Sequence, residues 1–418
     1  MKRFFFILSF LTNLLMSFNS AHSQWVQIAD FPVTGLYEVC FINPDIGFVS
    51  GVENSNYVLY KSIDGGITWM PVGANIIGMI QDMCFVDDQV GFILTDDNWE
   101  GYIYKTSDQG DSWEQVFTFG MSAKAISFPD ENTGYAVFSA TDNAWIFKTV
   151  DNGDTWDQIN YLTTEIGGAG VTDMQFISSE LGYLVFEWGI AYKSVDGGSN
   201  FVETYQDYDY NLYSMHFINT DTGFMVGEYK QSFLIDSCGF IAKTTNGGND
   251  WIKSSLPGHF KDVTFINSDT GYIAAENYIY ESFDGGNSWQ ISELDSNLYL
   301  LIAVDFPDQT TGYALSNWFT MSRLYKLDLY ADIKDPAGFN NIYRLYPNPV
   351  SDYCNLTIPD ELGTVAFTLI DLSGATVYGD IFDTPAVRRI NLDSFSPGMY
   401  LGILKSRSGM NVFKMVIK

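Results

Sequence analysis

Basic residues and histidine are scarce in this 418-residue sequence. Lys and Arg together number 21 against 51 Asp and Glu, which gives a formal net charge of −30. Nucleic acid and anionic membrane surfaces repel a chain with this charge, so neither is an expected partner. Beyond the first 23 residues the histidines are His216 and His259, which leaves no obvious material for a zinc triad or a Ser-His-Asp arrangement. We therefore expect no metal and no cofactor.

Cysteine is also rare, with four residues spread along the chain: Cys40, Cys84, Cys238 and Cys354. They form no C-x-x-C pair and lack the density of a disulfide scaffold. Cys40 and Cys84 occupy equivalent positions of an internal repeat, so their side chains should project in the same direction rather than at each other. We expect small buried side chains, with a Cys40–Cys84 disulfide as the less favoured alternative.

Long apolar runs are absent except at the amino terminus. Residues 1–23 combine a basic start, an apolar run from Phe4 to about Met16 and the small-x-small end Ala21-His22-Ser23. This pattern predicts a secretory signal peptide cleaved before Gln24. A membrane anchor is the alternative, but the run is short for a bilayer. No later segment reaches 18 uninterrupted apolar residues, so we expect no membrane span in the mature chain.

The sequence is rich in aromatic residues, at 16%, and has 37 Gly, whereas charged residues make up only 17%. This composition is typical of many short strands joined by turns and predicts an all-β protein. With 46% hydrophobic residues, the chain has enough apolar material for one large domain and one small one.

A first motif recurs about every 40 residues: an aromatic residue, a polar turn, then Gly and a second aromatic residue. Its seven copies begin at Phe41, Phe85, Phe128, Phe176, Phe217, Phe265 and Phe306. Strand-like runs flank each turn, so each copy predicts a β-hairpin in which the Gly adopts the positive φ of a tight turn.

A second motif alternates with the first and reads Lys-Ser/Thr-x-Asp-x-Gly-x-x-Trp in its commonest form. Its six copies are centred on Asp64, Asp108, Asp151, Asp196, Asn246 and Asp284. They resemble the Asp-box, a signature shared by several propeller families. The Asp side chain should accept backbone N–H groups within the turn, and the Gly permits a left-handed φ. We therefore assign these residues a structural and not a catalytic role.

Together the motifs give four strands per unit and seven units, which predicts a seven-bladed β-propeller over residues 24–330. The seventh unit lacks a fourth strand. Gln24–Ile28 matches the fourth-strand pattern, so the first strand of the mature protein should complete the last blade and leave no open end. A capped solenoid is the rival architecture.

The repeat stops after Leu329. Residues 331–342 read as a linker, and 343–418 alternate apolar and polar residues as in a small immunoglobulin-like β-sandwich. This stretch includes Tyr346-Pro-Asn-Pro349 and Gly398-Met-Tyr400, and it resembles the type A sorting domain of the type IX secretion system, found in the Bacteroidota. The resemblance implies passage through the periplasm, recognition by the type IX machinery, and release or anchoring at the cell surface. A generic adhesive sandwich is the alternative.

The propeller resembles two Asp-box lineages. Sialidases grip a carboxylate with three arginines, whereas residues 24–330 contain only Arg323, which excludes that activity. The alternation of the two motifs looks closer to the propeller family of the photosystem II assembly and stability factor. The arginine-rich face of that family is missing here, so only the scaffold carries over.

Candidate ligand-binding residues lie in the variable segments that join the second and third strands. The expected aromatic set is Trp99, Trp145, Trp188, Tyr229 and Trp318, with acidic neighbours Asp97, Asp142, Glu187 and Glu228. Flat aromatic rings beside carboxylates suit a sugar face or a captured peptide. The alternative is that these rings only cover blade edges. The acidic stretch 205–213 could hold calcium, but a solvated loop is favoured because its spacing is not that of an EF-hand.

These observations favour an exported, non-enzymatic propeller that binds a glycan or a surface protein. No catalytic residue is assigned. Two alternatives stay open: a polysaccharide-degrading enzyme or its accessory subunit, since paired-carboxylate chemistry cannot be dismissed by counting acids, and a structural envelope or adhesion component.

Overall fold

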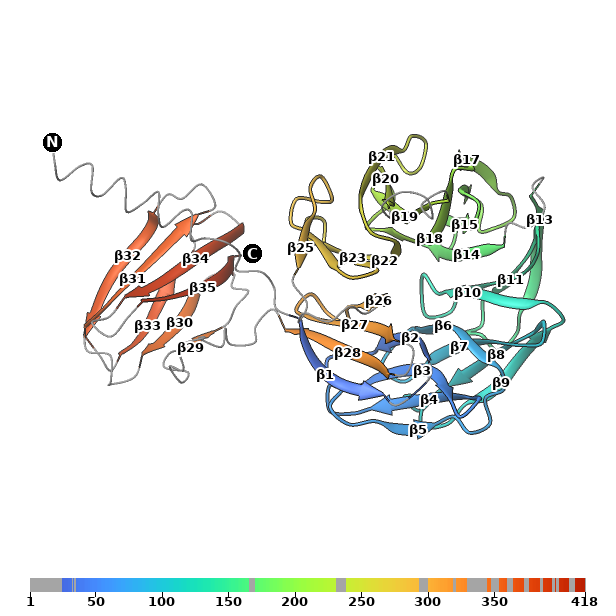
Figure 1. The fold of residues 1–418 in the computed structure, drawn as a ribbon, viewed down its shortest axis with the longest axis horizontal. Helices are drawn as coiled ribbons and strands as arrows, with labels where there is room; N and C mark the ends of the chain where they lie inside the picture. The colour runs from blue at the N-terminus through green and yellow to red at the C-terminus, as the bar shows by residue number, and fades with distance from the viewer. Residues whose placement is uncertain are drawn as a thin grey trace. The chain divides into compact units, whose positions relative to one another are not determined.

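All the described elements of the computed structural model are strands, as the composition predicts (Figure 1). The described residues are 25–31, 33, 35–164, 170–230, 238–292, 300–318, 321–328, 344–346, 353–358, 364–371, 376–383, 386–392, 395, 398–405 and 410–417. The chain divides into two compact units, Met1–Leu329 and Tyr330–Lys418. The predicted signal peptide, 1–23, and the predicted linker, 331–342, lie outside the described residues.

Seven four-stranded antiparallel sheets make up the described part of the first unit, and we call each sheet a blade. Blade one is β2 (Gly35–Phe41), β3 (Gly47–Glu53), β4 (Asn56–Ser62) and β5 (Met70–Val72), and blade two is β6 (Met79–Phe85), β7 (Gly91–Asp97), β8 (Glu100–Thr106) and β9 (Glu114–Phe119). Blade three is β10 (Ser122–Ser127), β11 (Gly134–Ala140), β12 (Asn143–Thr149) and β13 (Asp157–Thr163), and blade four is β14 (Val171–Phe176), β15 (Gly182–Phe186), β16 (Ile190–Ser194) and β17 (Val202–Gln206). Blade five is β18 (Tyr210–Phe217), β19 (Gly223–Tyr229), β20 (Cys238–Thr244) and β21 (Ile252–Pro257), and blade six is β22 (Phe260–Phe265), β23 (Gly271–Ala275), β24 (Ile279–Ser282) and β25 (Gln290–Ser292).

Blade seven joins the two ends of the first unit. It consists of β26 (Leu300–Asp305), β27 (Thr311–Trp318), β28 (Met321–Asp328) and, at its outer edge, β1 (Val26–Phe31). β1 runs antiparallel to β28, with Val26 opposite Lys326. The predicted closure by the first strand is therefore confirmed, although Gln24, its expected first residue, lies outside the described residues.

The first strand of each blade lies at the inside of the ring, next to the first strand of the following blade (Figure 1). Side chains on these inner strands bond to the neighbouring backbone. Asp82 accepts the N–H of Ile126 at 2.8 Å, and Asp173 accepts that of Met215 at 2.8 Å. Asp305 accepts the N–H of Phe41 at 2.6 Å, which ties blade seven to blade one. Carboxylates thus link the inner strands at these three blade junctions.

The first sequence motif forms the contact between blades. Its leading Phe stacks on the ring that comes after the motif Gly of the preceding blade, with centroids 3.4–5.2 Å apart. The seven stacked pairs are Tyr313–Phe41, Phe48–Phe85, Phe92–Phe128, Tyr135–Phe176, Tyr183–Phe217, Phe224–Phe265 and Tyr272–Phe306. Trp25 of blade seven, which is 1% exposed, packs edge-on against the last of these pairs. One aromatic layer therefore repeats at every described blade junction.

The expected positive φ of the motif glycines is wrong. None of the seven, Gly47, Gly91, Gly134, Gly182, Gly223, Gly271 and Gly312, is among the described residues with positive φ. Each instead has the leading Phe of its own motif lying on it, so that a Cβ would stand 2.3–2.5 Å from that ring. The motif needs Gly because the ring occupies the space of a side chain.

The second motif forms a turn between the third and fourth strands, which we call the aspartate turn. In blade one, Asp64 Oδ1 accepts the N–H of Thr68 at 2.8 Å, and Asp64 Oδ2 accepts its hydroxyl at 2.6 Å. Gly65 and Gly66 have φ of 71° and 87°. The motif Lys reaches the next blade: in blade four, Lys193 Nζ donates to Gly247 O at 2.7 Å.

The aspartate turns lie beside the turns that join the first and second strands. The N–H of Gly65 donates to Asp45 O at 2.8 Å, and corresponding bonds recur in blades two to six. We call this side the turn face. On the other side, which we call the loop face, the segments that join the second and third strands contact the connections between blades, as in the bond from the N–H of Glu187 to Gly170 O at 2.9 Å.

The second unit holds a three-stranded and a four-stranded sheet. The first is β29 (Arg344–Tyr346), β30 (Tyr353–Ile358) and β33 (Ala386–Asn391); the second is β32 (Thr376–Asp383), β31 (Thr364–Asp371), β34 (Gly398–Lys405) and β35 (Met410–Ile417). Leu356 and Ile390 from one sheet and Phe367 and Met415 from the other belong to one buried cluster. The two sheets therefore share a core.

Substitution of a motif glycine should destabilise the blade junction. In Gly182→Ala the new Cβ would stand 2.4 Å from the Phe176 ring, and we expect unfolding to become easier by about 1–3 kcal/mol. Gly120→Ala is the matched control, because no atom lies within 4 Å of its Cβ position. Urea unfolding of both variants measures the difference, and equal midpoints would contradict the proposed role of the glycine.

The inner-strand carboxylates should make stability depend on pH. Burial raises the pKa of Asp82, Asp173 and Asp305 to about 7. An acid with a raised folded-state pKa binds more protons when folded, so the free energy of unfolding should fall as pH rises from about 4 to about 7. Burial lowers the pKa of His216 to about 4, which opposes this trend. Carboxyl groups whose pKa is lowered, such as Glu228, oppose it only near the acid end of this range.

We therefore expect a higher melting temperature at pH 5 than at pH 7.5. Asp173→Asn should raise the melting temperature at pH 7.5 and flatten the pH dependence, since the amide oxygen can still accept the N–H of Met215. The exposed Asp88→Asn is the control. A wild-type melting temperature that rises between pH 5 and pH 7.5 would refute the expectation.

Candidate binding site on the loop face

Trp188 lies on the loop face in the turn between β15 and β16. Its ring is partly buried against the cluster shared by blades three and four. Lys230 Nζ, from blade five, lies 4.9 Å from the ring centroid. Gly189 comes next with a φ of 72°, and a Cβ there would stand 1.9 Å from Asp207 O, so the turn is fixed by close backbone packing. Trp188 thus presents an aromatic ring at the junction of blades four and five.

Tyr229, at the end of β19, lies 5.6 Å from Tyr210 by ring centroids. Lys230 comes next in the chain, and its N–H donates to Asp209 O at 2.9 Å. The Lys230 side chain contacts the Trp188 ring, whereas the Tyr229 ring packs beside Tyr210.

The other three predicted aromatic residues lie elsewhere. Trp99 occupies the turn between β7 and β8, with a φ of 72° and 65% exposure. Trp145 is within β12, and its ring lies 5.2 Å from Tyr161, so its expected place in a connecting segment is wrong: the third strand begins earlier, at Asn143. Trp318 is the last residue of β27, so its expected place in a connecting segment is also wrong, and its side chain lies outside the described residues.

A polar cluster surrounds Glu228 at the junction of blades five and six. Glu228 Oε2 lies 2.6 Å from His259 Nδ1 and 3.7 Å from Lys261 Nζ. The Tyr213 hydroxyl donates to Glu228 Oε1, and Lys261 Nζ lies 3.9 Å from the Tyr213 ring centroid. His259 Nε2 lies 3.7 Å from Glu276 Oε2. We call these five residues the Glu228 cluster.

The cluster holds Glu228 in its charged form. Burial raises the pKa of Glu228, but the Tyr213 hydroxyl and the charges of Lys261 and His259 outweigh it, and the net pKa is lowered. Burial and the bond to Glu228 raise the pKa of Tyr213. Glu276, at 39% side-chain exposure, is the most open of the charged members. The cluster therefore combines two carboxylates, Glu228 and Glu276, with the Lys261 ammonium group and the His259 ring, all of them partly buried.

The Glu228 cluster adjoins Trp188 through the backbone. Glu187 precedes Trp188, and its carbonyl accepts the N–H of Leu212 at 3.1 Å; Tyr213 is the next residue after Leu212. The negative charge of Glu187 acts to raise the pKa of both Lys230 and Tyr213. For Lys230 the effect of burial is larger, and its net pKa is lowered. An aromatic ring and a charged network thus lie together over blades four to six.

The hydrogen bonds of the Glu228 cluster show which of its groups are already engaged. In the described part of the chain, no hydrogen bond connects His259 to a hydroxyl or thiol that could serve as a nucleophile. The carboxylate oxygens of Glu228 already accept bonds from Tyr213 and His259. Toward a ligand, Lys261 Nζ can donate hydrogen bonds and the Glu276 carboxylate can accept them.

The remaining polar candidates are engaged in structure. Asp207, in the acidic stretch 205–213, forms an ion pair with Lys253. Within the described ranges, no group of three or more His, Cys, Asp or Glu is placed to hold a metal ion. Cys40, Cys84, Cys238 and Cys354 are free thiols, so the alternative of a Cys40–Cys84 disulfide is wrong. Burial raises the pKa of Cys84 to about 12.

Sequence reasoning named Glu228 only as a neighbour and missed the cluster around it. Tyr213 and Lys261 hold the same place on their inner strands, at the bulge that precedes Ser214 and Asp262. Alignment of the repeats could have placed these two side by side. The partnership with His259 and Glu276 depends on how two loops fold, which the repeat pattern does not contain.

The first unit is similar to solved β-propellers. A structure titled "YCF48 bound to D1 peptide" superposes with a TM-score of 0.56 at 18% identity, covering 72% of this chain and 96% of that one. YCF48 from Cyanidioschyzon merolae gives 0.58 at 16% identity, covering 73% and 99%. The WD40 repeats of RRP9 give 0.56 at 10% identity, covering 74% and 99%. At these identities the likeness shows the fold alone, and the fold is a β-propeller.

No curated protein matches the chain in sequence. Among the described residues, no helix is long and apolar enough to cross a membrane.

The C-terminal unit has a family match. Residues 344–418 match the family model of the secretion system C-terminal sorting domain. This agrees with the resemblance noted in the sequence and indicates export by the type IX secretion system to the cell surface or the medium. The chain is thus a β-propeller with a type IX secretion sorting domain at its carboxyl end.

Proposed function

We propose that the protein is an exported, non-enzymatic binding propeller that takes a glycan or a surface protein on the loop face of blades four to six. The observation that carries the proposal is the partly exposed Trp188 ring beside Lys230 and the Glu228 cluster. An aromatic face next to hydrogen-bonding charged groups is the usual composition of a carbohydrate or peptide site.

The repeat architecture supports this choice of face. The turn face is built from nearly identical aspartate turns, and we assign Asp64, Asp108, Asp151, Asp196, Asn246 and Asp284 to folding. The loop face differs from blade to blade, and variable loops on a rigid scaffold are where recognition usually resides. The YCF48 structure solved with a D1 peptide supports, by analogy only, a protein ligand for such a scaffold.

We infer a route of export for the chain. Residues 1–23 direct it to the periplasm and are removed, 24–330 form the seven-bladed propeller, and 343–418 form an immunoglobulin-like sandwich that the type IX machinery recognises. The source would be a member of the Bacteroidota. Trp188 is the proposed principal contact and Tyr229 a proposed contributor. Trp99, Trp145 and Trp318 belong to blades two, three and seven, so we do not include them in this site.

Removal of the Trp188 ring should weaken binding. A screen of the mature chain against immobilised glycans and envelope proteins would first select a ligand. We expect Trp188→Ala to lower the affinity for that ligand by about tenfold or more, because the aromatic stacking area is lost. Val150→Ala is the control, since Val150 is exposed at an aspartate turn on the turn face. Unchanged affinity in Trp188→Ala, with unchanged folding, would reject this face as the binding site.

The ionised state of Glu228 should depend on Tyr213. In Tyr213→Phe the hydroxyl that donates to Glu228 Oε1 is lost, so the pKa of Glu228 should rise, as NMR titration of labelled glutamate would measure. Tyr37→Phe is the matched control, because Tyr37 holds the same bulge position on the inner strand of blade one. If the Glu228 titration is identical in both variants, the hydrogen bond does not set its charge.

A further inference from the structure

Blade one has an open strand edge on its third strand. β4 begins at Asn56, but its first residue paired with β5 is Leu59, opposite Val72. In the six other blades the fourth strand reaches the first or second residue of the third strand. Within the part of the chain that the structure describes, Asn56–Val58 therefore lacks the outer neighbour that the equivalent residues have in the other blades.

The connection after Val72 draws the chain away from β4. Gly73 has a φ of 64°, and a Cβ there would stand 2.5 Å from Ile76, so the chain turns away at this point. The turn is then held on blade two: Asn75 Nδ2 donates to Trp113 O at 2.6 Å, and the N–H of Ile77 donates to the Tyr104 hydroxyl at 3.1 Å. The short β5 is thus fixed by its connection, and the open edge is built into the fold.

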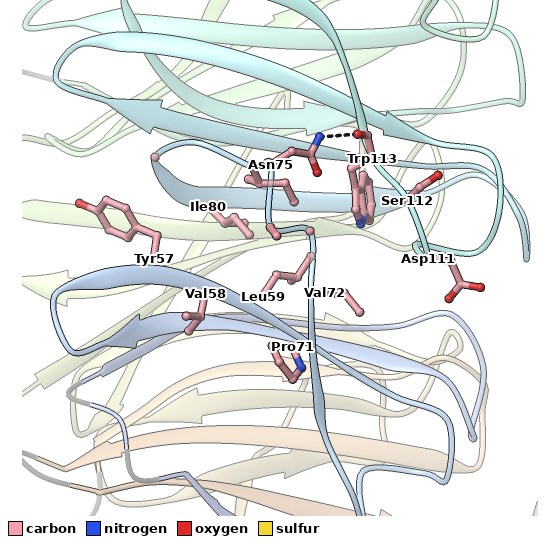
Figure 2. A pocket seen from close by; sticks show the side chains of 14 residues that line it. Tyr57, Val58, Leu59, Pro71, Val72, Asn75, Ile80, Asp111, Ser112 and Trp113 are labelled. Atoms are coloured by element: carbon pink, nitrogen blue, oxygen red, sulfur yellow. Dashed lines mark hydrogen bonds between the residues drawn. The ribbon is translucent and has the colours of Figure 1, made fainter.

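A groove lies beside this open edge, between blades one and two. Its volume is about 620 Å³. Figure 2 shows Tyr57 on one side of the groove and Trp113, Ser112 and Asp111 toward the other, with Leu59 and Ile80 between them. Asp111 is the only charged residue among those that line the groove. The lining is therefore mostly apolar, and the Asp111 carboxylate is paired with Lys61 Nζ at 2.6 Å.

The backbone groups at the open edge can be assigned from Pro71. Because Pro71 has no N–H, its pairing with Tyr60 is a non-hydrogen-bonded one, and Leu59 is the residue that directs its N–H and C=O to β5. By the period of two along a strand, Tyr57 directs the same groups outward, where β5 has already ended. Tyr57 is 48% exposed.

We propose that blade one binds an extended peptide segment of another protein, which adds a strand to β4 beside Tyr57 and places apolar side chains in the groove. In strand addition the main-chain hydrogen bonds of an open edge give affinity, and an adjacent apolar groove can take the side chains of the added strand. The net charge of −30 favours a neutral or basic segment over an acidic one, whereas the Asp111 carboxylate is already paired with Lys61 Nζ at 2.6 Å. This site is separate from the one on blades four to six.

The test uses three acetylated and amidated heptapeptides with the mature chain. The first is Lys-Val-Thr-Val-Thr-Val-Lys, the second has Glu at both ends, and the third has Pro at its centre. We expect saturable binding of the Lys peptide below about 1 mM in fluorescence anisotropy, weaker binding of the Glu peptide and none of the Pro peptide. Hydrogen exchange of the Tyr57 amide should slow when the Lys peptide binds.

Two variants at one position isolate the backbone contact. Tyr57→Pro removes the outward N–H, whereas Tyr57→Thr retains it; β3 pairing should survive both, because Tyr57 directs its N–H away from β3. The affinity for the Lys peptide should fall about tenfold or more in the Pro variant only.

Ala74→Trp is a second test that does not depend on folding of the Pro variant. The new side chain fills the groove from an exposed loop and should also weaken binding of the Lys peptide.

Three outcomes would overturn the proposal. These are the absence of saturable binding by the Lys peptide, equal affinity in the Pro and Thr variants when both are folded, and equal affinity for the Glu and Lys peptides at low salt. Concentration-dependent dimerisation that is lost in Tyr57→Pro, without peptide binding, would show that a second copy of the chain occupies the edge instead.

Discussion

The stack of two aromatic rings between neighbouring blades is the contact on which the rest of the first unit depends. A four-stranded blade has two faces to cover, and in this chain the motif Phe of one blade covers the ring of the blade before it, as Phe176 covers Tyr135 at 3.4 Å. Since the first blade receives its partner ring, Tyr313, from the last, the layer is complete only when the ring is closed.

The same layer explains where the recurring polar groups of each repeat go. The motif Lys lies over the aromatic ring of its own blade and bonds to the next blade, as Lys193 does with the Tyr183 ring and Gly247 O. The inner carboxylates bond to neighbouring backbone N–H groups, as Asp173 does with Met215. Because turn face, inner strands and blade faces are all occupied in this way, the loop face is the side on which residues can differ between blades without loss of the ring.

Sequence periodicity was sufficient for the architecture because each repeat carries its own packing information. The closing strand could be found since Trp25 has the signature of a fourth strand. The reason for the motif Gly was mistaken, because a turn explanation and a packing explanation predict the same residue, and only the Phe ring above Gly47 separates them. The Glu228 cluster could not be assembled from sequence, since its members come from separate loops and strands whose approach is set by local backbone geometry.

The open edge of blade one places a constraint on the whole chain. An unpaired strand edge beside an apolar groove invites pairing between copies, and proteins ordinarily block such edges. Here the edge residues Asn56 and Val58 carry no charge, so the blocking must come from elsewhere. A net charge of −30 opposes the approach of a second identical chain far more than that of a neutral or basic segment. The negative charge of the chain therefore disfavours pairing of this edge with a second copy of the chain, and it leaves the edge available to a neutral or basic strand.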